Sequence, residues 1–149
     1  MEIEMKYAIP DKATADAIWD DPYLEEIGEV DSRETVYMKS AYFDTEDRIL
    51  ARHDIAFRVR MEGTRVVASL KWNGESKDGL HRREEVNVPV ADPACFLAPS
   101  PLIFKESETG QAMIELVGAQ RLESILEIRF LRRRMRVDNG KSILELAVD

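Results

Sequence analysis

The sequence predicts an α+β protein built on an antiparallel β-sheet that closes into a barrel, with a charged interior and helices packed outside. Three observations support this prediction. Several segments alternate between charged and apolar side chains, which is the period-two pattern of β-strands. Two hairpin signals, at residues 63–64 and 139–140, join neighbouring segments as antiparallel pairs. The charged positions converge on arginine and glutamate, whereas an ordinary solvated face mixes several kinds of polar residue.

The length and composition are typical of one ordered globular domain. The chain has 149 residues, of which 44% are apolar and 34% charged. A net charge of -8 opposes general affinity for nucleic acid or anionic membranes. No apolar run approaches the roughly 20 residues that a membrane-spanning helix needs, and the acidic N-terminus does not resemble a signal peptide. Cys95 is the single cysteine, so no intramolecular disulfide can form. We therefore expect one cytoplasmic domain over residues 1–149, without a nucleic-acid or membrane partner.

The first part of the chain is expected to supply two strands with a helix between them. A strand over about 2–9 ends at Pro10, which cannot donate to a β-ladder. Asp11 can cap a helix over about 12–20. Residues 33–44 are rich in β-forming side chains and are expected to form the next strand. The polar residues after this strand start a turn or a single helical turn.

The rest of the chain is expected to form five further strands and one helix. Alternation and β-forming residues mark the strands, and apolar residues at helical spacing mark the helix. The strands are expected over residues 55–62, 65–72, 81–90, 124–138 and 141–149, and the helix over residues 109–118. A polar loop with Gly74 and Gly79 is expected before the strand 81–90. Prolines between residues 93 and 101 indicate a loop with short helical pieces.

The charges of each predicted strand fall on one of its faces. In the first strand, Glu2, Glu4 and Lys6 point one way and the apolar residues the other. The corresponding faces of the later strands carry Arg58, Arg60, Ser69, Lys71, Arg83, Glu85, Asn87, Glu145 and Asp149. Any one of these strands fits a sheet with one face in water. In a barrel the same faces line the interior, and a charged interior requires a charged ligand because unpaired buried charges are very costly.

Taken in order, these residues resemble those of the CYTH domain family, the triphosphate tunnel metalloenzymes. The first match is Glu-x-Glu-x-Lys at Glu2, Glu4 and Lys6, which alone is a weak signal. The further matches, in chain order, are Tyr-Phe-Asp-Thr at 42–45, Arg-x-Arg at 58–60, Ser-Leu-Lys at 69–71, Arg-x-Glu at 83–85, a late basic strand with Arg132, and Glu-x-Ala-x-Asp at 145–149. Ordered matches over nearly the whole chain make the resemblance specific.

The resemblance implies a tunnel of eight antiparallel strands that binds a triphosphate together with Mg²⁺ or Mn²⁺. The basic residues that would bind the triphosphate are Lys6, Arg58, Arg60, Lys71, Arg83 and Arg132. The metal would be held by Glu2, Glu4 and Glu145, since hard cations prefer carboxylate oxygens. The catalytic residues would be Lys6, Glu85 and Glu145. For Glu85 and Glu145, three roles stay open: ligating metal, orienting the attacking water, or holding arginines in position.

The function that the resemblance implies is metal-dependent hydrolysis of a triphosphate, with inorganic triphosphate as the expected substrate and phosphate as the product. Thiamine triphosphatase and adenylate cyclase activities are alternatives within the same fold. A non-catalytic module that binds polyphosphate or nucleotide is an alternative of a different class.

Two features of the sequence depart from the family pattern. Asp54 stands where the family has a glycine shortly before its Arg-x-Arg strand. Family members also continue past the strand that corresponds to 145–149, and their last strand carries a further Glu-x-Glu pair. The sequence then supplies about six of the eight strands, so we expect an incomplete or open barrel. Exposed strand edges favour association, so a homodimer formed through them is a further expectation.

Overall fold

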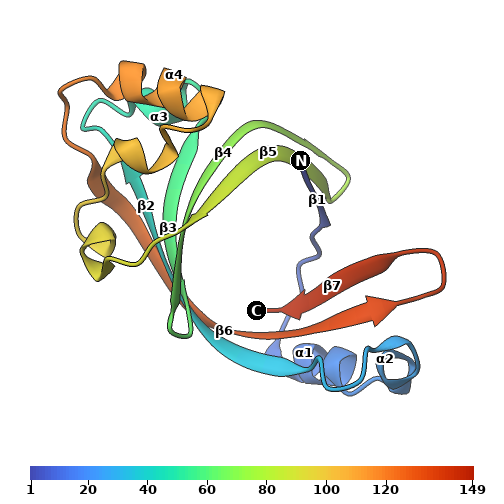
Figure 1. Ribbon diagram of the computed structural model, residues 1–149. Helices are drawn as coiled ribbons and strands as arrows, with labels where there is room; N and C mark the ends of the chain where they lie inside the picture. Colours follow the sequence, from blue (N-terminus) through green and yellow to red (C-terminus); the bar gives the residue numbers. More distant parts are fainter. The chain divides into compact units, whose positions relative to one another are not determined.

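The computed structural model describes residues 1–149 and contains a seven-stranded sheet, four α-helices and two 3₁₀-helices (Figure 1). The strands are β1 (Glu2–Met5), β2 (Glu34–Asp44), β3 (Ala56–Glu62), β4 (Arg65–Lys77), β5 (Leu80–Pro89), β6 (Glu123–Asp138) and β7 (Ile143–Val148). The helices are α1 (Lys12–Trp19), α2 (Pro22–Ile27), α3 (Ile49–Arg52), η1 (Pro93–Phe96), η2 (Pro101–Phe104) and α4 (Glu108–Val117). No helix combines the length and apolar character needed to cross a bilayer.

The strand order in the sheet is β1-β5-β4-β3-β2-β6-β7. The pairs β1–β5, β2–β3, β3–β4, β4–β5 and β6–β7 are antiparallel, which confirms the predicted α+β class and its antiparallel sheet. The chain divides into two compact units. The first comprises Met1–Lys6 and Met38–Arg129, and the second comprises Tyr7–Tyr37 and Phe130–Asp149. Strands β2 and β6 each contribute residues to both units.

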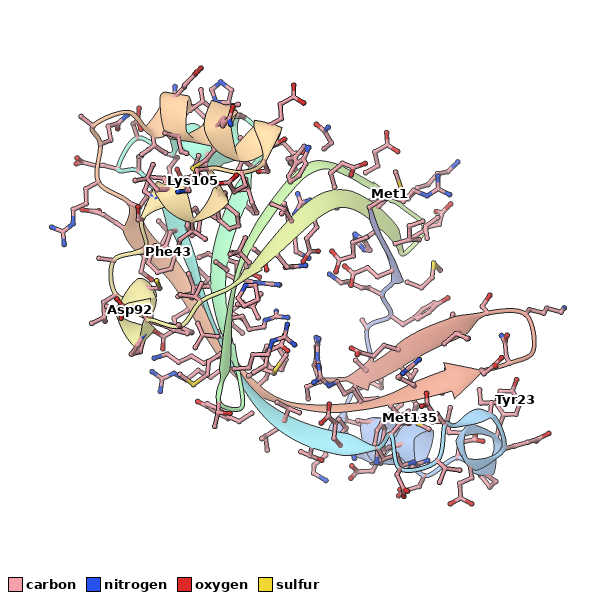
Figure 2. All side chains as sticks on the ribbon, viewed as in Figure 1. Met1, Tyr23, Phe43, Asp92, Lys105 and Met135 are labelled. Carbon is pink, nitrogen blue, oxygen red and sulfur yellow. The ribbon has the colours of Figure 1, made fainter.

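The hydrophobic core of the first unit lies between β2–β4 and the short helices (Figure 1). Phe57 on β3 is fully buried, and its ring meets Phe43 and Phe104 edge to face, with centroids 6.1 and 5.1 Å apart. Phe43, labelled in Figure 2, comes from β2, and Phe104 comes from η2. Met113 and Val117 of α4 complete this cluster at helical spacing. The apolar faces of the strands therefore point toward the helices, and the charged faces point away from them.

Gly110 allows α4 to pack closely against η2. A Cβ at this position would lie 1.8 Å from the carbonyl oxygen of Phe104, a distance that no side chain tolerates. Helix α4 begins at Ser107, whose hydroxyl accepts a hydrogen bond from the Gly110 amide at 2.9 Å. The helix predicted over residues 109–118 is confirmed, with both ends shifted by one residue.

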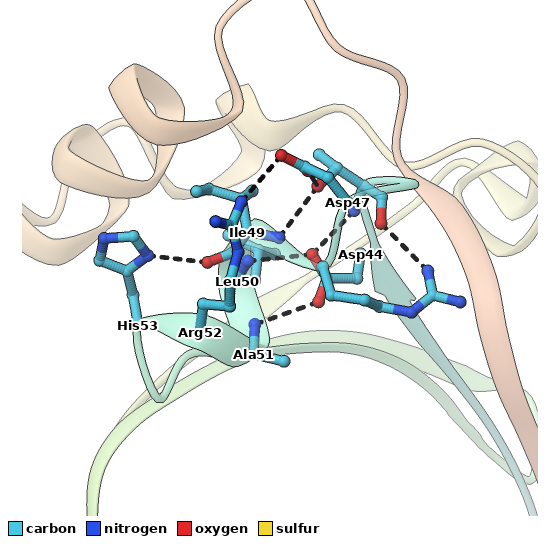
Figure 3. Close-up of polar contacts among 9 residues, drawn as sticks. Asp44, Asp47, Ile49, Leu50, Ala51, Arg52 and His53 are labelled. Carbon is cyan, nitrogen blue, oxygen red and sulfur yellow. Dashed lines mark hydrogen bonds and ion pairs between the residues drawn. The ribbon is translucent and has the colours of Figure 1, made fainter.

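The corner between β2 and α3 is organised by a buried carboxylate. Asp44 accepts hydrogen bonds from the backbone amides of Thr45, Leu50 and Ala51, at 2.8, 3.0 and 3.1 Å (Figure 3). Its side chain is 2% exposed. The bonds to Leu50 and Ala51 satisfy amides in the first turn of α3, which have no partner within the helix. The expected turn or single helical turn after residue 44 is therefore α3.

The second unit packs helix α1 and the end of α2 with the β6–β7 hairpin. Asp11 caps α1 as predicted, by accepting a hydrogen bond from the Thr14 amide at 2.8 Å. The predicted hairpin at Asn139 and Gly140 is confirmed, and Gly140 has the positive φ of +80° that such a turn favours. The buried apolar residues of this unit are Ala15, Met135, Val137 and Val148, a smaller set than in the first unit.

The two largest differences in predicted boundaries are at the ends of β1 and β4. The first strand ends at Met5 instead of residue 9, although the Lys6 amide still donates to the Gly79 carbonyl at 2.9 Å. Strand β4 runs on to Lys77 through the segment predicted as a polar loop. Pairing with β5 outweighs the turn preference of Gly74, and the register shift between Trp72 and Glu75 absorbs the irregularity. The turn itself forms at Gly79, where φ is +83°.

Candidate functional site

The register of the strands in the first unit sets the predicted site residues side by side. Arg58 on β3 is paired with Ser69 on β4, which is paired with Asn87 on β5. In the same way Lys71 on β4 is paired with Glu85 on β5. Directly paired residues of an antiparallel sheet project from the same face. The shared face that the alternation predicts for these strands is therefore confirmed.

Lys71 lies between two carboxylates. Its ammonium is 2.5 Å from Glu2 Oε2 and 2.9 Å from Glu85 Oε2, and its side chain is only 14% exposed. Burial, together with the neighbouring Glu85 carboxyl, raises the pKa of Glu2. Burial would also raise the pKa of Glu85, but hydrogen bonds with Glu2 and Lys71 and the charge of Lys71 outweigh it and lower that pKa to about 2. Glu85 is thus the member of the pair that stays ionised.

Glu4 and Lys6 form a second, more open pair on the same face of the N-terminal segment. The Lys6 ammonium lies 2.7 Å from Glu4 Oε1, and the Lys6 side chain is 62% exposed. An exposed pair of this kind contributes little to folding stability. Both side chains can exchange partners at little cost, which suits residues that are predicted to bind phosphate and metal.

Arg58 carries a positive charge with no carboxylate partner. Its Nη2 donates to the Ser69 hydroxyl at 3.1 Å, and its Nε is buried without any hydrogen-bond partner. Arg60, two residues along β3, donates from Nε to the Ser40 hydroxyl at 2.8 Å. A buried guanidinium N–H without an acceptor is costly. Arg58 is therefore the group on this face that most needs an anionic ligand.

Arg83 on β5 is positioned by Asp54, which lies in the loop between α3 and β3. Its Nη2 lies 3.3 Å from Asp54 Oδ1, and Asp54 Oδ2 accepts a hydrogen bond from the Gly74 amide at 2.8 Å. Asp54 has a φ of +53°, which is the conformation that glycine favours and aspartate tolerates. This backbone geometry explains how Asp54 replaces the family glycine. A Cβ at position 74 would lie 2.6 Å from Arg83 Nε, so Gly74 makes room for the guanidinium.

Arg132 and Glu145 belong to the β6–β7 hairpin of the second unit. Arg132 binds Asp149 through two parallel hydrogen bonds of 2.6 and 2.7 Å. Glu145 is paired in register with Arg136, so the two side chains share a face of the hairpin. Arg134 forms an ion pair with Glu34 at 2.5 Å. The arginines of this hairpin therefore differ from Arg58, because each already has an acidic partner.

A cavity of about 530 Å³ lies beside α1 in the second unit. Its charged lining includes Asp16 and Arg133, which bind each other at 2.8 Å. None of the predicted site residues lines this cavity. Asp149, the last residue of the Glu-x-Ala-x-Asp match, does line it.

A family model for the CYTH domain matches residues 1–149. The chain belongs to the CYTH family. It is 28% identical over 121 residues to an inorganic triphosphatase of Haemophilus influenzae, a match that covers 78% of this chain and 31% of that protein. The chain thus spans about a third of the length of this curated relative.

Solved structures show that this CYTH chain has the fold of the family. It resembles an adenylyl cyclase candidate from Hippeastrum, described as having a dominant triphosphatase activity, with a TM-score of 0.65, 21% identity, and coverage of 99% of this chain and 72% of that one. It also resembles a candidate adenylate cyclase from Bacillus halodurans, with a TM-score of 0.54, 20% identity, and coverage of 98% and 70%. These likenesses support the predicted fold class. The seven strands of the sheet correspond to the seven segments predicted as strands.

Several residues that shape the site of this CYTH chain were not predicted from the sequence as binding or catalytic residues. Ser40, Ser69 and Asn87 contact the arginines or their partners, and Asp54 contacts Arg83. The alternation of the sequence places Ser69 and Asn87 on the charged face, so it could have identified these two residues. Their contacts depend on the strand register, which alternation alone does not define.

Proposed function

We propose that this CYTH chain hydrolyses a triphosphate, with inorganic triphosphate as the preferred substrate and a divalent cation as cofactor. The observation that carries the proposal is the Arg58 guanidinium, which has a buried N–H without an acceptor and no acidic partner. A phosphate oxygen supplies both the missing acceptor and the opposite charge. The curated relative and the Hippeastrum protein, both described as triphosphatases, support the same reaction class.

The basic residues of the site would bind the phosphates in this proposal. A triphosphate carries about four to five negative charges, and multidentate binding by arginine and lysine suits it. Arg58 and Arg60 project from one strand, and each donates a hydrogen bond to a serine hydroxyl. The ion pair between Lys6 and Glu4, at 2.7 Å, is exposed, and the ion pair between Arg83 and Asp54 is long, at 3.3 Å. A phosphate can therefore replace the carboxylate in either pair. Arg132 is assigned to the same function by family resemblance.

The acidic residues fit a hard divalent cation. Mg²⁺ and Mn²⁺ are usually held by one or two carboxylates together with phosphate oxygens and water. Glu2 and Glu85 lie close enough to share Lys71, and Glu4 lies two residues from Glu2 on the same face. No group of three His, Cys, Asp or Glu side chains gathers as a preformed site, which fits a metal that is bound together with its substrate. When bound, the cation would neutralise phosphate charge and activate water.

The proposed catalytic residues are those that would contact the attacking water or the terminal phosphate. Glu85 stays ionised because of its low pKa and can accept a hydrogen bond from the attacking water. The Lys6 ammonium can stabilise the charge that develops on the transferred phosphoryl group. The family resemblance assigns Glu145 the role of metal ligand or water-orienting residue.

A hydrolysis screen of tripolyphosphate, ATP and thiamine triphosphate with Mg²⁺ and Mn²⁺ tests this proposal. We expect the fastest phosphate release from tripolyphosphate and none after chelation of the metal. Arg58→Ala should lower kcat/KM by about 100-fold, because it removes a charged partner of the phosphate. Glu4→Ala should abolish phosphate release, because it removes a proposed ligand of the metal.

Arg82→Ala is the matched control, since Arg82 is exposed and adjacent to Arg83 but lies on the opposite face of β5. Its activity should equal that of the wild type. Tight binding of tripolyphosphate without turnover under any of these conditions would instead support a non-catalytic binding module.

A further inference from the structure

Three side chains on adjacent strands form a hydrogen-bonded row that ends at Arg58. Arg58 Nη2 donates to Ser69 Oγ at 3.1 Å, and Ser69 Oγ donates to Asn87 Oδ1 at 2.5 Å. The three residues are direct cross-strand partners on β3, β4 and β5. Ser69 is fully buried, whereas Asn87 is exposed at the outer end of the row.

The direction of this row is determined by chemistry. A guanidinium can only donate, so the Ser69 oxygen must accept from Arg58. The one hydroxyl hydrogen of Ser69 is then free to donate, and the carbonyl oxygen of Asn87 is its acceptor. With Oδ1 occupied, the amide NH₂ of Asn87 is available to donate toward the Glu85 carboxylate, which lies two residues away on the same face of β5 and whose pKa Asn87 helps to lower. Each member of the row therefore has one orientation in which all bonds are made.

We infer that Asn87 is a positioning residue, which acts through Ser69 to hold the Arg58 guanidinium ready for an anionic ligand. This inference rests on the proposed triphosphate site. Arg58 has no acidic side chain to orient it, so the Ser69 hydroxyl is its one protein anchor. That hydroxyl would rotate freely without Asn87, and Arg58 would lose a fixed acceptor. A neutral anchor also leaves the full charge of Arg58 available for phosphate, which a carboxylate anchor would not.

The first test observes Arg58 directly, by NMR of its Nε–Hε group in the full chain without ligand. In the wild type we expect a sharp signal in slow exchange with water, because this group is buried. Asn87→Ala should broaden or remove the signal, and so should Ser69→Ala. Asn87→Asp should retain it, because the new carboxylate still accepts from Ser69.

Ser40→Ala is the matched control for this measurement. Ser40 is as buried as Ser69 and accepts a hydrogen bond from Arg60, so its loss should leave the Arg58 signal unchanged. An unchanged Arg58 signal in Asn87→Ala would overturn the inference. So would an equal loss of the signal in Asn87→Ala, Asn87→Asp and Ser40→Ala, because it would indicate general loosening of the sheet.

The second test separates binding from chemistry. In Asn87→Ala we expect KM for tripolyphosphate to rise about tenfold, the usual effect of losing one hydrogen bond near a charged group, with a smaller change in kcat. An unchanged KM with an altered kcat would contradict a role in holding Arg58. If the wild type hydrolyses no triphosphate, the proposed function fails, and the Arg58 signal still decides whether Asn87 positions that residue.

Discussion

The charged side chains on the shared face of β3, β4 and β5, where the candidate site lies, differ chiefly in how they are neutralised. Lys71 is enclosed by two carboxylates, whereas Arg58 has none. A buried ion pair stabilises a protein little by itself, but removing one partner leaves an uncompensated charge. Lys71 therefore has a structural role that is separate from any contact with phosphate. It holds the carboxylates of Glu2 and Glu85 together.

Lys71→Met should lower the free energy of unfolding in the absence of divalent metal by about 1–3 kcal/mol. This is less than for a fully buried pair, because Glu2 is 36% exposed. Mg²⁺ should recover part of the loss, since a cation between Glu2 and Glu85 replaces the ammonium and stabilises the folded state. Thermal melts with and without Mg²⁺ measure both effects.

The control for this prediction is Lys105→Met. Lys105 is 66% exposed and lies 4.0 Å from Glu106, so its loss should change neither the melting temperature nor its response to Mg²⁺. If Lys71→Met melts like the wild type, or gains nothing from Mg²⁺, the carboxylate pair is not a cation site.

The ion pairs of Asp16 predict how the stability of the protein depends on pH. Hydrogen bonds from Lys12, at 2.6 Å, and from Arg133, at 2.8 Å, lower the pKa of Asp16 below its ordinary value of 3.8. A carboxyl group whose pKa is lower in the folded state contributes stability above its unfolded pKa, and loses it as the pH falls through the folded pKa. Asp16→Asn should therefore destabilise the protein near neutral pH, and the difference should vanish in acid.

Urea unfolding of the wild type and Asp16→Asn at several pH values between about 7 and 2.5 measures this difference. Asp20→Asn is the control, because Asp20 lies one helical turn further and forms no ion pair. A difference between wild type and Asp16→Asn that stayed constant down to the lowest pH would exclude the ion pairs as its origin.

Strand positions follow from the sequence, whereas the contacts between strands do not. Residues 55–62 alternate almost perfectly, and residues 124–138 were predicted as one long strand. The structure places β3 and β6 within one residue of these predictions at each end. The residues of the site face, such as Arg58 and Lys71, follow from the same alternation. The contact between Ser69 and Asn87 requires the register of β4 on β5, and that register depends on packing across the whole sheet.

The corner between β2 and α3 shows how one side chain can determine an element. Asp44→Ala removes three backbone hydrogen bonds from a buried position and leaves the amides of Leu50 and Ala51 without acceptors (Figure 3). We expect the free energy of unfolding to fall by about 2–4 kcal/mol, as measured by urea denaturation. Asp47→Ala, at the exposed side of the same corner, should cause a much smaller loss. Equal losses in the two variants would show that burial of Asp44 does not matter.

At the scale of the whole molecule, the two compact units have unequal hydrophobic cores. The first unit buries three phenylalanines with leucine, methionine and valine side chains beneath its helices. The second unit buries only Ala15, Met135, Val137 and Val148. Small cores supply little stability, because the apolar area that they remove from water is limited. Both units consist of two chain segments, but those of the second unit are farther apart in the sequence, so bringing them together costs more chain entropy.

The two tryptophans allow this imbalance to be tested, because each unit contains one. Trp19 lies in the second unit beside Arg33 and Arg133, and Trp72 lies in the first. In Trp72→Phe the fluorescence of Trp19 reports on the second unit, and in Trp19→Phe the fluorescence of Trp72 reports on the first. We expect the Trp19 transition at a lower urea concentration than the Trp72 transition, with circular dichroism showing both steps. Coincident transitions by all three probes would instead mean that strands β2 and β6, which are continuous through both units, couple them into one cooperative fold.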